Sequence, residues 1–159
     1  MGLKVDTLKG FLSRRIAKFR LYLRMAVTDL QYHEITEKII GCAMKVHRYF
    51  GPGFPEIVYK RTLIIELEKI GLECASELKR DIYYQGTFIY KRRLDLVVNN
   101  KILTELKAVA AIDNCCYAQI INYLRVFELE VGLALNFGAR SLQFKRFINT
   151  KNPRNPLNP

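Results

Sequence analysis

The feature that most constrains the fold is a pair of apolar segments with acidic side chains inside them. Residues 87–98 end in the run LDLVV, and residues 102–108 read ILTELKA. Both runs have the apolar, β-branched character of strands, and Asn99-Asn100 between them favours a turn because asparagine tolerates left-handed backbone. The two segments therefore predict a β-hairpin that carries carboxylates inside a sheet.

The hydrophobic pattern also predicts the register of this hairpin. Keeping the apolar side chains on one face gives three pairs, which are Val98 with Ile102, Leu96 with Thr104 and Leu94 with Leu106. The opposite face then pairs Asp95 with Glu105. The next pair along is Arg93 with Lys107. A slip by one residue would mix the two faces and bury charge.

Two carboxylates directly opposite each other repel and destabilise a sheet unless something neutralises them. A divalent cation does so well, since Mg²⁺ and Mn²⁺ prefer hard oxygen ligands. Arg93 and Lys107 offer the competing explanation, an ordinary cross-strand cluster of ion pairs. The hairpin by itself favours neither explanation over the other.

The rest of the chain predicts one sheet with helices around it. Apolar residues at helical spacing indicate helices, and alternation after Gly71 indicates strands. The expected helices cover 8–27, 34–49, 55–70 and 114–128. The expected strands cover 73–77, 80–85, 87–98, 102–108, 131–137 and 141–148, of which 131–137 is apolar enough for burial on both faces. This order predicts a mixed α/β domain.

The formal net charge of +11 is concentrated at the two ends of the chain. Residues 1–30 carry seven basic and two acidic side chains, residues 140–159 carry five basic and none acidic, and residues 31–139 carry 14 and 13. We therefore expect a basic amphipathic extension over 1–30, a domain over 31–150 and a mobile Asn/Pro-rich tail over 151–159. Basic ends favour a polyanionic partner.

Cysteine usage and hydropathy bear on the compartment. The four cysteines form no C-x-x-C pair and only two histidines exist, which argues against a structural zinc site. No run reaches the ~18 to 20 apolar residues that a membrane span needs, and no secretory signal is recognisable. A reducing, cytoplasmic setting is expected, and a homo-oligomer is left open.

Several motifs in order resemble a known family. The segment GPGFPEIVY reads Gly53-x-x-Glu56-x-x-Tyr59, preceded by Val46-His47, and is followed by Asp95 and then by Glu105-Leu106-Lys107. A later Gln119-x-x-x-Tyr123 resembles the motif that follows the Glu-x-Lys strand in RecB-type nucleases. Together they resemble the GxxExxY protein family, which is assigned to the PD-(D/E)XK nuclease-like superfamily. The resemblance covers about residues 34–149 and departs from the motif where Leu94 replaces the usual proline.

The resemblance implies a restriction-endonuclease-like core of αβββαβ order, with a mixed sheet flanked by helices. It also implies roles for individual residues. Glu56, Asp95 and Glu105 would hold Mg²⁺ or Mn²⁺, and Lys107 would position the attacking water or stabilise negative charge. Gln119 and Tyr123 would orient the lysine or contact DNA, and His47 would bind the metal or cap the glycine turn. Further candidates for contacts with nucleic acid are Arg93, Lys145 and Arg146.

The expected activity is therefore metal-dependent hydrolysis of phosphodiester bonds, with DNA as the expected substrate. Fold alone does not establish activity, so a non-catalytic module that binds nucleic acid or protein is the alternative. A third reading places the segment 8–27 on a membrane surface, because basic amphipathic helices bind there.

Overall fold

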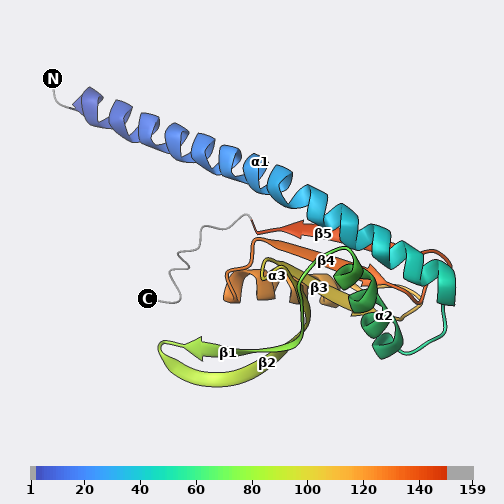
Figure 1. Cartoon of the computed structure of the whole chain (residues 1–159). Helices are drawn as coiled ribbons and strands as arrows, with labels where there is room; N and C mark the ends of the chain where they lie inside the picture. The colour runs from blue at the N-terminus through green and yellow to red at the C-terminus, as the bar shows by residue number, and fades with distance from the viewer. Residues whose placement is uncertain (1–2, 150–159) are drawn as a thin grey trace.

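The computed structural model describes residues 3–149, which form three helices and one five-stranded sheet (Figure 1). The helices are α1 (Leu3–Phe50), α2 (Glu56–Lys69) and α3 (Asn114–Val126). The strands are β1 (Cys74–Tyr84), β2 (Thr87–Val98), β3 (Ile102–Lys107), β4 (Val131–Asn136) and β5 (Gln143–Ile148). They lie in the order β1-β2-β3-β4-β5, and only β3 and β4 are parallel. The mixed α/β architecture expected from the sequence is confirmed.

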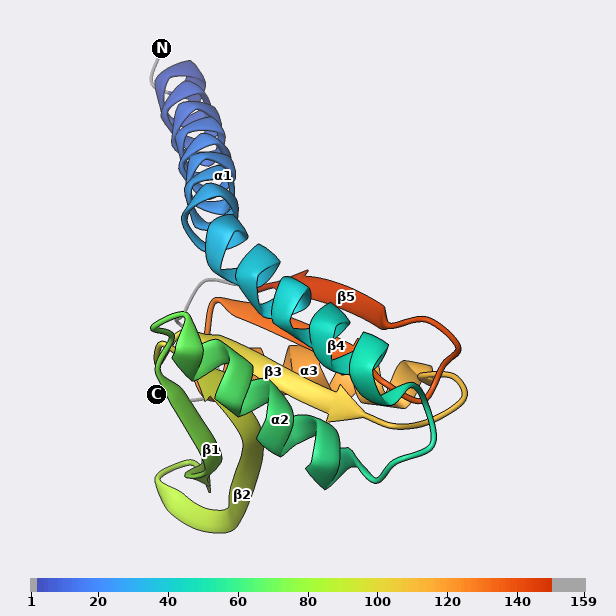
Figure 2. The same cartoon turned by 45° about the vertical axis from the view of Figure 1, so that its right-hand side comes forward.

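Helices cover both faces of the sheet (Figure 2). On one face, the second half of α1 and all of α2 pack on apolar side chains of β3 and β4, such as Leu106 and Leu133. On the other face, α3 packs on Leu103 and Ala134. The six residues of β4 are all buried, as its continuous apolar sequence predicts. Gly132 brings β4 close to α3, where a Cβ atom would lie 2.7 Å from a methyl carbon of Ile120.

Two elements are continuous where the sequence predicted a pair. The expected helices 8–27 and 34–49 form the single helix α1, because residues 28–33 contain neither glycine nor proline to interrupt it. The expected strands 73–77 and 80–85 form β1, which passes through Glu77 with a left-handed φ of 59°. The predicted tail, 151–159, lies outside the described residues.

The first part of α1 extends away from the sheet (Figure 1). Its described apolar side chains include Ile16, Phe19 and Leu23, which are all more than half exposed. In the part of the chain that the structure describes, no helix is long and apolar enough to cross a membrane.

The hairpin register is confirmed near its turn and differs from the prediction further out. Asn99 and Asn100 adopt φ values of 50° and 55°, and the β2–β3 ladder contains Val98–Ile102 and Leu96–Thr104. It ends there, so the predicted pairing of Asp95 with Glu105 and of Arg93 with Lys107 does not form part of it.

The predicted single core face also fails at Leu94. Leu94 packs in the cluster under α3, whereas Leu96 and Leu106 pack in the cluster under α1 and α2. Side chains two apart in a regular strand share a face, so β2 changes face at Asp95. This change lies beside the left-handed Glu77 of β1, and such irregularities re-aim side chains.

Candidate active site

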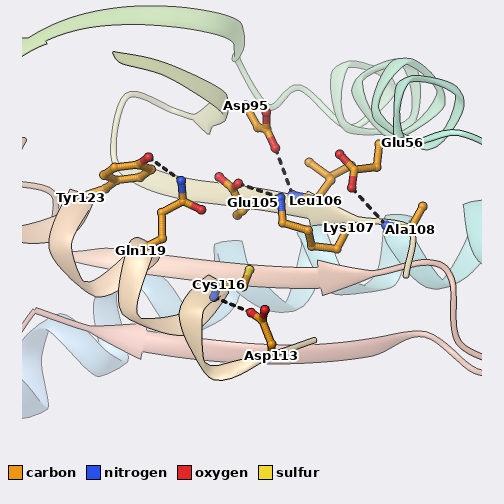
Figure 3. Close-up of polar contacts among 10 residues, drawn as sticks. All are labelled: Glu56, Asp95, Glu105, Leu106, Lys107, Ala108, Asp113, Cys116, Gln119 and Tyr123. Atoms are coloured by element: carbon orange, nitrogen blue, oxygen red, sulfur yellow. Dashed lines mark hydrogen bonds and ion pairs between the residues drawn. The ribbon is translucent and has the colours of Figure 1, made fainter. Parts of the chain in front are cut away.

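Glu105 and Lys107 lie at the end of β3, on the sheet face that α3 covers. Alternation along β3 directs Leu106 to the opposite face and these two side chains toward α3. Glu105 is only 4% exposed, and its Oε1 accepts a hydrogen bond from Lys107 Nζ at 3.0 Å (Figure 3). The short Glu-x-Lys spacing therefore pairs a buried acid with a partly exposed base.

The charges at this site are strongly coupled. Burial raises the pKa of the Glu105 carboxyl, the charge of Asp95 raises it further, and Lys107 and Arg92 offset only part of the rise. Burial by itself lowers the pKa of Lys107. The charge of Glu105, its hydrogen bond to Lys107, and the charges of Glu56 and Asp95 together outweigh burial and leave that pKa raised. Lys107 is therefore an ammonium group at neutral pH.

Asp95 approaches Glu105 from β2. Its Oδ2 accepts a long hydrogen bond of 3.5 Å from the backbone N–H of Leu106, between the two β3 site residues (Figure 3). Because β2 changes face at Asp95, this side chain can reach the backbone of β3. The predicted neighbourhood of the two carboxylates is thus present, although it arises from a side chain that reaches across and not from a ladder pair.

Glu56 reaches the same strand end from the other side. It is the first residue of α2, and its Oε1 accepts a hydrogen bond of 3.4 Å from the backbone N–H of Ala108 (Figure 3). A carboxylate in the first turn also complements the helix dipole. Glu56 therefore has both a structural explanation and a place beside Lys107.

The glycine turn before α2 determines where Glu56 lies. Gly51 and Gly53 have φ values of 66° and 110°, which other residues rarely adopt. The fully buried Tyr59 closes this turn, since its hydroxyl donates to the Gly51 carbonyl at 2.7 Å and accepts from the Phe54 N–H at 3.1 Å. Tyr59 also stacks on Phe137, with ring centroids 4.6 Å apart. The tyrosine is thus a core aromatic that fixes the turn.

The chain leaving β3 is held by its parallel neighbour. The buried Asn136 accepts hydrogen bonds at Oδ1 from the N–H groups of Val109 and Gly138, both at 3.1 Å. Phe137 N donates to the Lys107 carbonyl at 2.7 Å. These bonds fix the backbone that carries Lys107, and nothing in the sequence singled out Asn136 for this role.

Gln119 and Tyr123 lie side by side on α3, as their four-residue spacing predicts. Gln119 Nε2 donates to the Tyr123 hydroxyl at 2.5 Å (Figure 3). The guanidinium carbon of Arg92 lies 5.1 Å from the centroid of the Tyr123 ring. Arg92 is therefore part of the candidate site. The sequence pattern did not predict it, because strict alternation through Asp95 placed Arg93, and not Arg92, on the face of the site.

The remaining predicted residues make their contacts with other side chains and backbone groups. His47 is buried, and its Nε2 donates to the Ala139 carbonyl at 3.0 Å. Arg93 pairs through Nε with Glu77 at 2.6 Å. Lys145 lies over the Tyr117 ring at 4.4 Å, and Arg146 follows it in β5.

The donor set fits a hard divalent cation by its chemistry. Among the side chains that the structure describes, no three His, Cys, Asp or Glu groups converge closely enough to hold a metal ion. Asp95 and Glu105 nevertheless supply carboxylate oxygens. Burial, and secondly the charge of Asp95, raise the pKa of Glu105, and a bound cation would offset both effects. These two residues are the ones that would hold Mg²⁺ or Mn²⁺, and Glu56 of α2 lies at the same end of β3.

The sheet, its helices and a Glu-x-Lys strand beside an aspartate define a nuclease-like α/β domain. A family profile described as "PD-(D/E)XK nuclease superfamily" matches residues 33–147. The chain belongs to this superfamily.

Other comparisons add little to the family match. No curated protein matches the chain significantly. Among solved structures, the chain is similar to one titled "Crystal structure of SSO0001", with 18% identity, a TM-score of 0.43, and coverage of 87% of this chain and 80% of that one.

Proposed function

We propose that the protein is a divalent-metal-dependent nuclease that hydrolyses phosphodiester bonds, with DNA as its substrate. The observation that carries this proposal is the buried Glu105 with Asp95 and Lys107 around it. Two mutually repelling carboxylates beside an ammonium group suit a cation and a phosphate better than they suit a purely structural cluster.

Each side chain has a distinct task in this proposal. A bound Mg²⁺ or Mn²⁺ would lower the pKa of a coordinated water and withdraw charge from the phosphate. Asp95 and Glu105 would hold that ion, with Glu56 as a further ligand. Lys107, protonated at neutral pH, would donate from Nζ to oxygens on which negative charge develops, so its role is electrostatic. Tyr123 and Gln119 would contact the nucleic acid beside Arg92.

We also propose that the chain belongs to the GxxExxY group within the superfamily and works in a reducing, cytoplasmic setting. The turn at Gly53, with Glu56 and Tyr59 after it, supports the first proposal. The four cysteines are all free thiols in the structure, which supports the second.

The test is cleavage of labelled single-stranded DNA, double-stranded DNA and RNA in Mg²⁺, Mn²⁺ or EDTA. Wild type is compared with Glu105→Ala, Lys107→Ala and the control Glu68→Ala, which removes an exposed carboxylate from α2. We expect metal-dependent cutting that both site variants lose by a factor of about 100 or more and the control retains. Cutting that survives both substitutions, or occurs in EDTA, would contradict the assignment.

A non-catalytic binding module is the second candidate, and the lack of a three-ligand cluster among the described side chains favours it. Titration calorimetry with Mn²⁺ separates the two. A catalytic site should bind Mn²⁺ in a way that Glu105→Ala abolishes, whereas a module without catalysis needs no such binding.

A further inference from the structure

The outer part of the β1–β2 hairpin is the most basic segment inside the domain. We call residues 79–93 the hairpin arm; it projects from the body of the sheet in both views (Figures 1 and 2). The arm has five basic residues and one acidic residue, a balance of +4. The rest of 31–139 has nine basic and twelve acidic residues, a balance of −3. The positive charge of this near-neutral domain is therefore concentrated in the hairpin arm.

The arm has two distinct faces, which the strand register defines. Leu78 and Leu94 are partners across β1 and β2, and both pack in the cluster under α3. Cross-strand partners share a face, and the face repeats every second residue. The next partners on that side are Arg80 with Arg92, and then Ile82 with Tyr90. We call these four residues the inner face of the arm.

Two of the three cations on the opposite face are neutralised within the protein; the third, Lys79, forms no ion pair with a carboxylate among the described residues. Lys91 pairs with Asp81 at 3.6 Å, and Arg93 pairs with Glu77 at 2.6 Å. Glu77 also pairs with Lys60 of α2. This face therefore resembles an ordinary network of surface ion pairs.

The inner face, by contrast, places two arginines directly opposite each other. Among the described residues, no ion pair joins Arg80 or Arg92 to a carboxylate, and the buried Nε of Arg92 has no hydrogen-bond partner. Like charges directly opposite destabilise a sheet. A bound anion, such as a phosphate of a polynucleotide backbone, would offset this repulsion and satisfy the arginine donors.

Exposed aromatic rings accompany these arginines. Tyr90 on the inner face is 56% exposed, and the tip of the arm carries Tyr83, Tyr84 and Phe88 at 50%, 62% and 52%. Aromatic rings beside cations are the surfaces on which unpaired bases stack. A duplex keeps its base faces stacked internally and offers only its backbone, so this combination favours a single strand.

The inner face leads to the candidate active site. Arg92 contacts the ring of Tyr123, and Tyr123 is hydrogen-bonded to Gln119. From Phe88 to Arg92 the strand extends about 13 Å at roughly 3.3 Å per residue, which matches about four stacked nucleotides at about 3.4 Å each. We propose that the inner face of the hairpin arm binds a single strand of nucleic acid and directs it toward Glu105 and Lys107. The delivery to that site rests on the proposed nuclease function, whereas the binding does not.

The test measures binding without cleavage. Fluorescence anisotropy of labelled oligo(dT), oligo(rU) and a DNA duplex is recorded with the full chain in EDTA. Both single strands should bind more tightly than the duplex. Tyr90→Ala should weaken single-strand binding by about 5- to 150-fold, since stacking of one base contributes about 1–3 kcal/mol. The control Tyr49→Ala, which removes an 82% exposed tyrosine from α1, should leave the affinity unchanged.

A second comparison tests which face binds. Arg80→Gln and Arg93→Gln remove the same charge from opposite faces of the arm. Arg80→Gln should weaken binding more than Arg93→Gln does. It should also reduce the slope of log affinity against log salt concentration by about the amount expected for one lost phosphate contact. Equal effects, a stronger effect at Arg93, or a duplex that binds as tightly as the single strands would overturn the proposal.

The outcomes also separate this proposal from the nuclease function and from self-association. Loss of cleavage in Glu105→Ala with unchanged binding in EDTA supports both proposals, and binding without any cleavage supports the arm alone. β1 is an edge strand, and edge strands can pair with a second copy. If Tyr90→Ala changes the sedimentation coefficient but not the affinity for oligo(dT), the arm is a self-association surface and the proposal fails.

Discussion

Replacing Tyr59 by phenylalanine removes one hydroxyl group and leaves the stacked ring in place. That hydroxyl makes two hydrogen bonds, to the Gly51 carbonyl at 2.7 Å and from the Phe54 N–H at 3.1 Å. Each such bond contributes about 1 kcal/mol net, so the free energy of unfolding should fall by about 2 kcal/mol. For a chain of this size the loss corresponds to roughly 4–8 °C in melting temperature.

The assay is urea unfolding followed by far-UV circular dichroism, with the midpoint and the slope fitted separately. Tyr49→Phe is the matched control, because it removes a hydroxyl from a side chain that is 82% exposed, and it should change stability by less than about 0.5 kcal/mol. A Tyr59→Phe variant as stable as wild type would refute the idea that this hydroxyl closes the glycine turn. A lower midpoint with an unchanged slope would support it.

Two further substitutions test the electrostatics and the packing around β3. In EDTA, Glu105→Gln should raise the urea midpoint at neutral pH, because burial and the charge of Asp95 raise the pKa of the folded carboxyl and make its ionisation costly. The folded state then binds the Glu105 proton more tightly than the unfolded state does. The stability of wild type should therefore fall relative to that of the variant as pH rises from about 4.5 through the raised pKa. A difference in urea midpoint between variant and wild type that narrows over this pH range would contradict this explanation. Gly138→Ala should destabilise the protein by about 1–3 kcal/mol, because its Cβ would lie 2.4 Å from the backbone nitrogen of Val109. In the control Gly41→Ala, the added Cβ atom lies in helix α1 with no atom within 4 Å, so thermal melts should show no change or a stabilisation of up to about 1 kcal/mol. Equal changes in stability for Gly138→Ala and Gly41→Ala would contradict the close contact at Gly138.

Much of the fold could be predicted because it depends on short-range patterns. Helical periodicity located α2 and α3 to within a few residues, and the apolar run at 131–137 predicted the doubly covered strand β4. The two asparagines predicted the turn between β2 and β3, since left-handed backbone suits them. These predictions hold because each is determined by residues adjacent in sequence.

The errors share a different cause. Strict alternation through Asp95 predicted a ladder pair with Glu105 and assigned Arg93 to the site face. In the structure β2 changes face at Asp95, next to the left-handed Glu77 on the neighbouring strand. No signal in β2 itself reveals this change, because it depends on how β1 pairs with it.

The sequence by itself determined the identity of the candidate site residues and their order along the chain. Glu105 and Lys107 had to share a face because they are two apart in a strand. Only the tertiary structure decided which residues surround them. An irregularity in β2 places Asp95 beside β3, and Arg92 lies over the ring of Tyr123. The turn that the buried Tyr59 hydroxyl closes positions Glu56. The physical reason is that local patterns fix how a strand or helix forms, whereas burial, charge coupling and the direction of a side chain depend on which distant elements pack against it.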